Sequence, residues 1–493
     1  MNFDFLTAIV FLPVLGLLVI ALWPKPGQNT IRIIALISSL ASFFLSLVVF
    51  AAFDRSNASQ IQFEQYLSWI PAINAHYHLG VDGISLPLVV LTTLLGFLSV
   101  LISWKVSLRP REYFIWLLLL ESSVIGVFTS LDLLLFFVFW EVELIPMYFL
   151  ISIWGSGRRE YSAIKYVIYT LTGSAMMLAG FLILYFTTGS LDMTEMAGLG
   201  LTKLMVPAGV LFFLLIFAFI VKLPVFPLHT WLPDAHTDAP TAVSVMLAGV
   251  LLKMGGYGII RLCVTILPRV AYEYAQVMVI LAVISIIYGA AVTLRQTDLK
   301  RLIAYSSVSH MGYVLLGIFA FTQISLTGAS LQMFSHGIVT GLLFAMVGLV
   351  YEKTHERNLA KLGGLARRMP VIVVVFTIAG LASLGLPSTS GFVAEFLTFV
   401  GSFSSTVFTG IQAYTIIGIM GIVLCAGYIL WMLQRTFYGP PQEKYDHVPD
   451  ADAVEKLCIF IFVAAIMLIG LYPAILTDII KVGVVPIVKM VGL

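Results

Sequence analysis

Fourteen long runs of apolar residues divide this chain, and they limit its fold more than any other feature. A helix needs about 20 apolar residues to cross the hydrocarbon core of a bilayer. The charged share is only 11%, against roughly a quarter in a soluble domain. The sequence therefore predicts an all-α polytopic membrane protein, one transmembrane domain over residues 1–493, with about fourteen membrane helices. The runs cover residues 4–22, 31–53, 84–104, 113–130, 132–153, 162–186, 205–228, 241–262, 274–294, 301–321, 327–351, 370–401, 411–434 and 456–478.

Lysine and arginine are shared unevenly between alternate loops. The loops after the first, third, fifth, ninth, eleventh and thirteenth runs hold 19 of the 27 basic residues. Because cytoplasmic loops are enriched in Lys and Arg, these loops are expected to be cytoplasmic and both chain ends to lie outside. Two lysines lie inside runs, and the opposite side holds the remaining six basic residues: Arg55, Lys203, Arg261, Arg269, Lys481 and Lys489.

Two of the runs are interrupted in the same way. The run over 205–228 contains KLPVFP, and the run over 370–401 contains LGLPSTSGF. In transporters, paired broken helices indicate an inverted repeat with the ion path at its centre. We therefore expect two five-helix repeats, helices 4–8 (113–262) and helices 9–13 (274–434), with helices 7 and 12 broken. Since five is odd, the second repeat is inserted upside down.

Ionisable side chains lie inside the apolar runs, where each costs about 2.5 to 3.5 kcal/mol and is by default a functional group. A break in a helix frees backbone groups that water or side chains must satisfy, which suits a proton path. A desolvated lysine releases its proton readily, and a nearby carboxylate restores the charged form. The intramembrane groups are Glu121, Glu141, Glu143, Lys222, Lys253, His310, His336 and Glu395.

These groups also have structural interpretations. Glu141 and Glu143 point to nearly opposite helix faces, so we expect only one to face the path. Glu121, His310 and His336 could simply hydrogen-bond neighbouring helices. A plain proline kink does not explain a lysine two residues before Pro224. We therefore predict that Glu141 controls the proton on Lys222 and that Lys253 and Glu395 pass it on.

Redox and nucleotide chemistry have no motif in this chain. Cys263, Cys425 and Cys458 are isolated, without metal-ligand spacing, and no phosphate-binding glycine motif follows a strand-like segment. We expect no cofactor, metal or nucleic-acid site here, so any energy source lies on partners. The N-terminus lacks the features of a cleaved signal peptide, which predicts that the first run is retained.

Several segments resemble a known family, the antiporter-like membrane subunits of respiratory complex I (NADH-quinone oxidoreductase). The segments are FWEVELIPMYFLISIWG, VKLPVFPLHTWLPDAHTDAPTAVSVMLAGVLLKMGGYG, DLKRLIAYSSVSHMG and MFSHGIVTGLLFAMVGLVYEKTHERNLAKLGGLA. The resemblance is strongest to the M-type chain, because Glu395 stands where the L-type and N-type relatives usually carry lysine. The chain also ends soon after the last run, without the long lateral helix of the L type.

This resemblance implies roles for individual residues. Glu141 and Lys222 match the family's essential pair, Lys253 the central relay lysine, and His310 and His336 the linking histidines. Glu395 matches the terminal exchange group toward the outside. The family further implies that partner subunits carry flavin, iron–sulfur clusters and quinone, while this chain translocates protons in a bacterial plasma membrane.

Three alternatives stay open. FWEVELIP with GSGRREYSAIKY is also similar to cyanobacterial and chloroplast relatives in thylakoid-type membranes, whose electron donor is ferredoxin, so the donor is undecided. The same buried residues would serve a subunit of a multisubunit sodium/proton antiporter, although Glu395 favours the redox complex. A purely structural spacer is the third reading, and the costly buried lysines argue against it.

Overall fold

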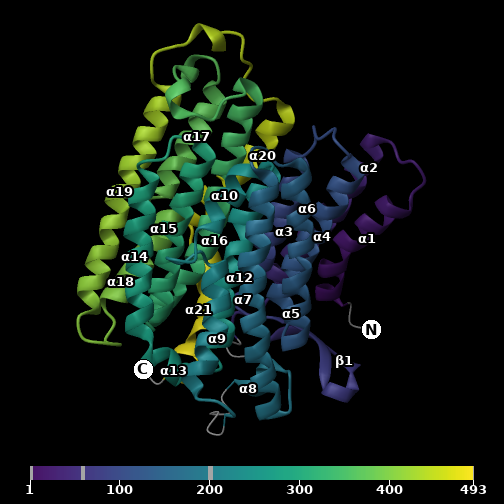
Figure 1. Ribbon diagram of the computed structural model, residues 1–493, viewed down its shortest axis with the longest axis vertical. Coiled ribbons are helices and arrows are strands. Elements are labelled where there is room, and N and C mark those ends of the chain that lie inside the picture. Colours follow the sequence, from purple (N-terminus) through teal and green to yellow (C-terminus); the bar gives the residue numbers. More distant parts are fainter. Residues whose placement is uncertain (1–3, 57–60, 198–203, 492–493) are drawn as a thin grey trace.

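The computed structural model describes residues 4–56, 61–197 and 204–491, and it is an upright bundle of helices (Figure 1). In these ranges twelve helical spans are long and apolar enough to cross a membrane. Two of them are composite, Leu133–Trp154 and Thr241–Val264. The other ten are α1 (Phe5–Leu22), α2 (Gln28–Ala52), α3 (Ser85–Ile102), α4 (Pro110–Thr129), α7 (Arg159–Thr188), α14 (Ala275–Thr293), α15 (Leu299–Phe319), α16 (Gln323–Thr354), α19 (Ile411–Phe437) and α20 (Ala453–Leu471). The all-α membrane fold is confirmed.

Both expected interruptions are present. The seventh run forms α9 (Ala208–Lys222), an irregular segment and the short α10 (Trp231–Asp238). The twelfth forms α17 (Pro370–Ser383) and α18 (Ser390–Phe403). The total of fourteen membrane helices and the inverted relation of the two repeats stay predictions.

Three runs differ from the expected single helices. The fifth is divided at Glu143 into α5 (Leu133–Val142) and α6 (Leu144–Trp154). The eighth alternates between α11 (Thr241–Met246), α12 (Leu252–Gly258) and two π-helical stretches, η2 (Leu247–Leu251) and η3 (Ile259–Val264). The last run ends at Leu471 because Pro473 cannot continue the helix, and a further helix, α21 (Ala474–Val491), replaces the expected tail.

A β-hairpin lies at one end of the bundle, with α8 (Met193–Met196), α13 (Pro268–Glu273) and the C-terminus (Figure 1). Antiparallel strands β1 (Gln62–Ile70) and β2 (Ala75–Val81) are joined through η1 (Pro71–Ile73). This end is the side expected to lie outside. Lys203, which is also assigned to that side, falls beyond the described residues. The loop before α20 lies at the opposite end of the bundle (Figure 1). Loops expected to be cytoplasmic contain the 3₁₀ turns η4 (Leu359–Lys361), η5 (Leu365–Arg367) and η6 (Glu443–Tyr445).

His78 fastens the hairpin to the bundle. Its Nδ1 lies 2.8 Å from Asp192 Oδ2 and its Nε2 lies 2.8 Å from Glu64 Oε1. Burial alone lowers the pKa of the imidazole, but the hydrogen bonds and charges of Asp192 and Glu64 outweigh it and raise the pKa above its usual value. Burial would raise the pKa of Asp192, yet the hydrogen bonds from His78 and Thr194 hold it below its usual value.

Asp132 connects the same hairpin to the first repeat. Its Oδ1 accepts hydrogen bonds from the backbone N–H of Leu134 and Leu135, which caps the start of α5. Its Oδ2 accepts a third, 2.9 Å long, from the backbone N–H of His76. The helix that carries Glu141 and ends before Glu143 therefore begins next to a residue that also holds the hairpin.

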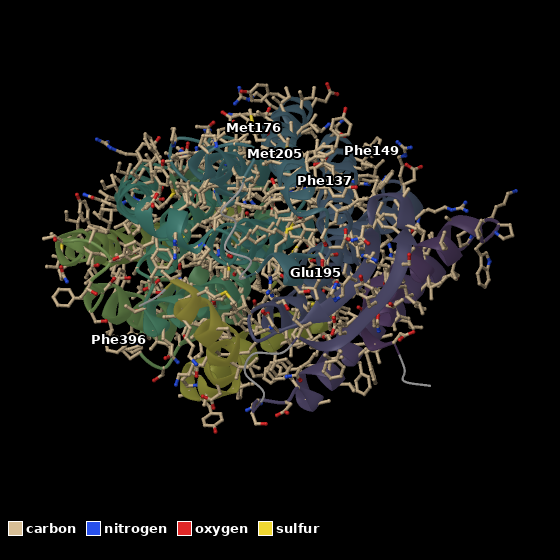
Figure 2. All side chains as sticks on the ribbon, turned by 90° about the horizontal axis from the view of Figure 1, so that it is seen from below. Phe137, Phe149, Met176, Glu195, Met205 and Phe396 are labelled. Carbon is tan, nitrogen blue, oxygen red and sulfur yellow. The ribbon has the colours of Figure 1, made fainter. Side chains whose placement is uncertain are left out.

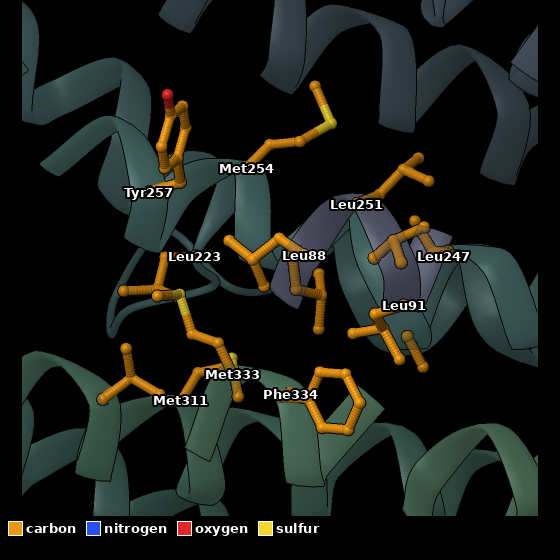
Figure 3. Packing of buried hydrophobic residues seen from close by; sticks show 14 of the residues in the cluster. Leu88, Leu91, Leu223, Leu247, Leu251, Met254, Tyr257, Met311, Met333 and Phe334 are labelled. Carbon is orange, nitrogen blue, oxygen red and sulfur yellow. The ribbon is translucent and has the colours of Figure 1, made fainter. Parts of the chain in front are cut away.

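The centre of the bundle is packed around the first break. Leu223 lies near Leu88 of α3 and Met333 of α16, in one buried cluster that also includes Leu91 and Phe334 (Figure 3). Helices α3, α15 and α16 are almost wholly buried, whereas the peripheral helices expose large apolar side chains outward. Phe396 at the rim in Figure 2 is 55% exposed, as expected for a surface that meets lipid.

Candidate proton path

Side chains of neighbouring segments form hydrogen bonds with backbone groups at the first break. The indole Nε1 of Trp231 donates a 2.9 Å hydrogen bond to the carbonyl of Val221. The backbone N–H of Phe226 donates to Ser285 Oγ at 3.0 Å. Gly255 lets the next helix approach closely, because a Cβ there would lie 2.6 Å from the carbonyl oxygen of Phe219. Side chains thus meet two of the backbone groups at the interruption.

Lys222 ends α9 and is buried, with 1% of its side chain exposed. Its ammonium pairs with the carboxylate of Glu143, which is fully buried. Lys222 Nζ also donates to the hydroxyl of Tyr166 at 3.0 Å, and that hydroxyl donates to Glu143 Oε2 at 2.8 Å. The ammonium lies 5.5 Å from the ring centroid of Trp140. Lysine, tyrosine and glutamate form a closed buried triangle.

The carboxylate bound to Lys222 in the structure is Glu143, and the functional pairing of Glu141 with Lys222 stays a prediction. Residues two apart point to different sides of a helix, and α5 turns Trp140 inward. Glu141 is half-buried, and its Oε1 is enclosed with no hydrogen-bond partner in the described part of the chain. The sequence showed that one glutamate faces inward, but it held no information on which.

Lys253 lies between the two π-helical stretches. A π turn links each residue to one five positions away, and such turns concentrate at functional sites. Here the ammonium of Lys253 donates to the carbonyl of Ala248, five residues earlier, and approaches His336 Nδ1 at 2.8 Å. The side chain is fully buried. The irregular helix therefore supplies a backbone acceptor for a lysine that, among the described residues, forms no ion pair with a carboxylate.

His310 and His336 lead from Lys253 to the second break. Their ring centroids are 5.6 Å apart, and His310 Nδ1 lies 3.3 Å from Glu395 Oε1. A cavity of about 10 Å³ between these three side chains and Ser335 is close to the smallest that holds one water, about 10 to 15 Å³. Gly385, with φ +78°, opens the break to Glu395, because a Cβ there would lie 2.7 Å from Glu395 Oε2.

Two histidines after the first break were missed by sequence reasoning. His229 and His236 are buried, and none of their ring nitrogens has a hydrogen-bond partner among the residues described. His236 stacks on Phe344 with centroids 4.5 Å apart and lies within electrostatic reach of Lys300 and Lys253. The available signal was two histidines seven residues apart, at and directly after the break in the helix.

Glu121 stands apart from these groups. It is fully buried on α4, and its Oε1 lacks a hydrogen-bond partner within the described ranges. It packs against Gly96 of α3, where a Cβ would lie 2.6 Å from Glu121 Oε1. Within the same ranges, no group of three or more His, Cys, Asp or Glu side chains is placed to hold a metal ion.

The arrangement brings together buried lysine, histidine and glutamate side chains at two interrupted membrane helices. Each of these groups exists with and without a proton, and histidine both donates and accepts hydrogen bonds. Such a bundle defines a class of protein, the antiporter-like membrane subunits.

The chain belongs to the NADH:quinone oxidoreductase/Mrp antiporter transmembrane family, whose sequence model matches residues 130–421. It is 43% identical over 489 residues to NAD(P)H-quinone oxidoreductase chain 4 1 of Synechococcus elongatus, covering 97% of this chain and 90% of that one. It is 41% identical over 503 residues to NADH-quinone oxidoreductase subunit M of Rhodobacter capsulatus, covering 99% and 96%. The resemblance to M-type complex I subunits is confirmed.

Solved structures agree on the fold. A chain of respiratory complex I from Thermus thermophilus with bound NADH superimposes with a TM-score of 0.88 at 27% identity, covering 99% of this chain and all of that one. A chain of the Mrp complex from Dietzia sp. gives a TM-score of 0.85 at 21% identity, with both chains fully covered. At that identity the Mrp match shows a shared fold alone.

Proposed function

We propose that this chain is the proton-translocating M-type subunit of an NADH-quinone oxidoreductase in a bacterial plasma membrane. The observation that carries the proposal is the row of contacts Lys253, His336, His310 and Glu395, which joins the buried lysine to the second broken helix. Every neighbour in that row holds or releases a proton, and each lies in the protein interior.

The two glutamates of the first repeat divide the work at Lys222. Glu143 and Tyr166 hold the ammonium in place. Glu141 is the exchangeable group: its unpartnered oxygen and half-buried position suit a carboxyl that takes up and loses protons. Neutralising Glu141 or moving its charge weakens the hold on the proton of Lys222, which then passes toward Lys253. Glu395 exchanges protons toward the outside.

Partner subunits would supply the redox chemistry. Flavin, iron–sulfur clusters and quinone belong to them in this proposal, and this chain binds only protons and its membrane neighbours. The repeats over 113–262 and 274–434 would each provide half of the path, one open to each side of the membrane.

Two alternatives concern the energy source. A sodium/proton antiporter subunit would use the same residues, and the family description covers both kinds of protein. Glu395 and the 41% to 43% identity to quinone oxidoreductase chains favour the redox complex. The similarity to a Synechococcus chain keeps a ferredoxin-dependent photosynthetic complex as the other candidate.

The test is replacement of Lys253 by methionine, which keeps the length of the side chain and removes its charge. In membrane vesicles we expect proton uptake and the coupled NADH- or ferredoxin-driven quinone reduction to be lost, with the complex still assembled on a native gel. Lys481→Met, on the exposed face of α21, is the matched control and should behave as wild type. An assembled Lys253→Met complex that pumps at the normal rate would remove the relay from the proposal. Activity driven by a sodium gradient without a redox donor would select the antiporter alternative.

A further inference from the structure

A cavity of about 610 Å³ opens between α3, α16 and α20, at the end of the bundle expected to be cytoplasmic. On α16 its wall is formed by Ala345, Gly348, Leu349, Tyr351 and Glu352, and His355 follows directly after the helix. The rise of the helix from Ala345 to Glu352 is about 10 Å at 1.5 Å per residue. That length is about two thirds of one leaflet of a hydrocarbon core about 30 Å thick. The cavity therefore reaches well into one lipid leaflet.

The mouth of the cavity is charged. Lys105 Nζ lies 2.7 Å from Glu455 Oε1, 2.9 Å from Glu352 Oε1 and 3.0 Å from Asp452 Oδ2. Lys353 Nζ approaches the other oxygen of Glu455 at 3.1 Å. Three carboxylates against two ammonium groups leave one negative charge in excess. A head group that carries an ammonium is complementary to this cluster.

The deeper wall is apolar. Leu101 and Ile102 end α3, Cys458 and Ile459 line the α20 side, and Ala345 of α16 leaves space by its small size. Trp104 stands at the mouth, where the amphipathic indole is typical of the membrane–water interface. A charged mouth above an apolar shaft matches an amphipathic ligand oriented like the surrounding lipid.

We infer that this cavity binds one acyl chain of a phospholipid from the cytoplasmic leaflet whose head group carries an ammonium, as phosphatidylethanolamine does. The head-group ammonium lies beside the carboxylates of Glu352, Asp452 and Glu455, which carry one negative charge more than Lys105 and Lys353 balance. An anionic lipid whose head group has no ammonium is repelled by the excess negative charge of this cluster.

The test uses the whole complex in vesicles that contain phosphatidylethanolamine with a diazirine in the distal half of one acyl chain. After illumination, mass spectrometry of the peptides should place cross-links on the shaft, at Ala345, Leu349 and Ile459. The same diazirine on phosphatidylglycerol should label these positions at least about fivefold less, which corresponds to ~1 kcal/mol for one charge at the membrane surface. Equal labelling by both lipids would overturn the head-group assignment. Labels confined to outward residues such as Phe460 would overturn the site.

Filling the shaft provides the matched variant. Ala345→Phe places a large ring in the cavity and should abolish the shaft cross-links. Leu457→Phe, on the outward face of α20 where Leu457 is 51% exposed, should leave them unchanged. Shaft labelling that persists in Ala345→Phe would contradict the inference. If Ala345→Phe does not assemble, the comparison of the two head groups on the wild-type complex decides.

Discussion

Replacing Glu143 with glutamine should leave Lys222 as an uncompensated cation in the interior. The two side chains are 0% and 1% exposed, so water cannot take over the role of the missing carboxylate. Breaking a buried pair by removing one partner costs about 3 to 5 kcal/mol. A change of about 1.4 kcal/mol is a factor of ten. If the whole loss of about 3 to 5 kcal/mol appears in the rate, inactivation of the complex at a fixed temperature should be roughly 100-fold faster or more.

Glu141→Gln is the matched control, because the same chemical change two residues away breaks no ion pair. We expect its thermal inactivation to stay within a factor of about five of wild type, the change of about 1 kcal/mol that is common for single substitutions. Its proton uptake should nevertheless be lost, since glutamine cannot exchange protons. The two variants thus separate holding Lys222 from exchanging its proton.

The assay is quinone reduction and proton uptake in membrane vesicles, with the inactivation rate followed at a fixed temperature and assembly checked on a native gel. The double variant Glu143→Gln with Lys222→Met removes both charges, so it should recover most of the stability while staying inactive. Glu143→Gln complexes as stable as wild type, or a double variant no more stable than the single one, would refute the assignment of the pair.

Three further predictions concern the second break, the topology and the hairpin. Glu395→Lys should keep partial pumping, whereas Glu395→Ala should lose most of it; near-normal proton uptake in both would exclude Glu395 from the path. A cysteine at Arg158 should react with an impermeant maleimide from the cytoplasmic side only, and one at Leu67 of the hairpin from the outside only; the reverse pattern would invert the bundle. Because the pKa of His78 is raised in the folded protein, its contribution to hairpin docking is complete below the unfolded value of 6.5 and is lost as the pH rises through the folded pKa. Because the pKa of Asp192 is lowered, its contribution is complete above the unfolded value of 3.8. A spin label at Leu67 should therefore be least mobile between these two pH values and become more mobile as the pH rises through the folded pKa of His78. His78→Asn should abolish that loosening, and a wild-type label insensitive to pH would contradict it.

The apolar runs predicted the membrane helices because the bilayer imposes one length and one solvent on all of them. Prolines and glycines in KLPVFP and LGLPSTSGF located both interruptions for the same local reason. The last run was extended past Leu471 because its apolar composition continues, although Pro473 ends the helix. The hairpin was not predicted, since β1 and β2 lie between the apolar runs and the contact that docks the hairpin joins His78 to Asp192, far apart in the chain.

The site was predictable in its membership and less so in its contacts. A charged residue within an apolar run, such as Lys222 or Glu395, is identified as a candidate whichever face of the helix it lies on. The choice between Glu141 and Glu143 depends on the rotation of α5, which the cap at Asp132 and the packing of Trp140 settle in three dimensions. The role of Ala248 as acceptor for Lys253 required a π turn, which no residue pattern announces.

Lys222 occupies the last residue of α9, so it stands at the negative pole of a helix macrodipole. A cation in that position gains about 0.3 to 1 kcal/mol at a surface and up to ~2 kcal/mol when partly buried. The ammonium is therefore stabilised from two directions, by the peptide dipoles of α9 and by the carboxylate of Glu143. The dipoles are part of the helix and cannot be withdrawn, whereas a side chain can rotate or be neutralised. In the proposed path, control over the proton on Lys222 therefore comes from the α5 and α6 side, and α9 needs no movement of its own.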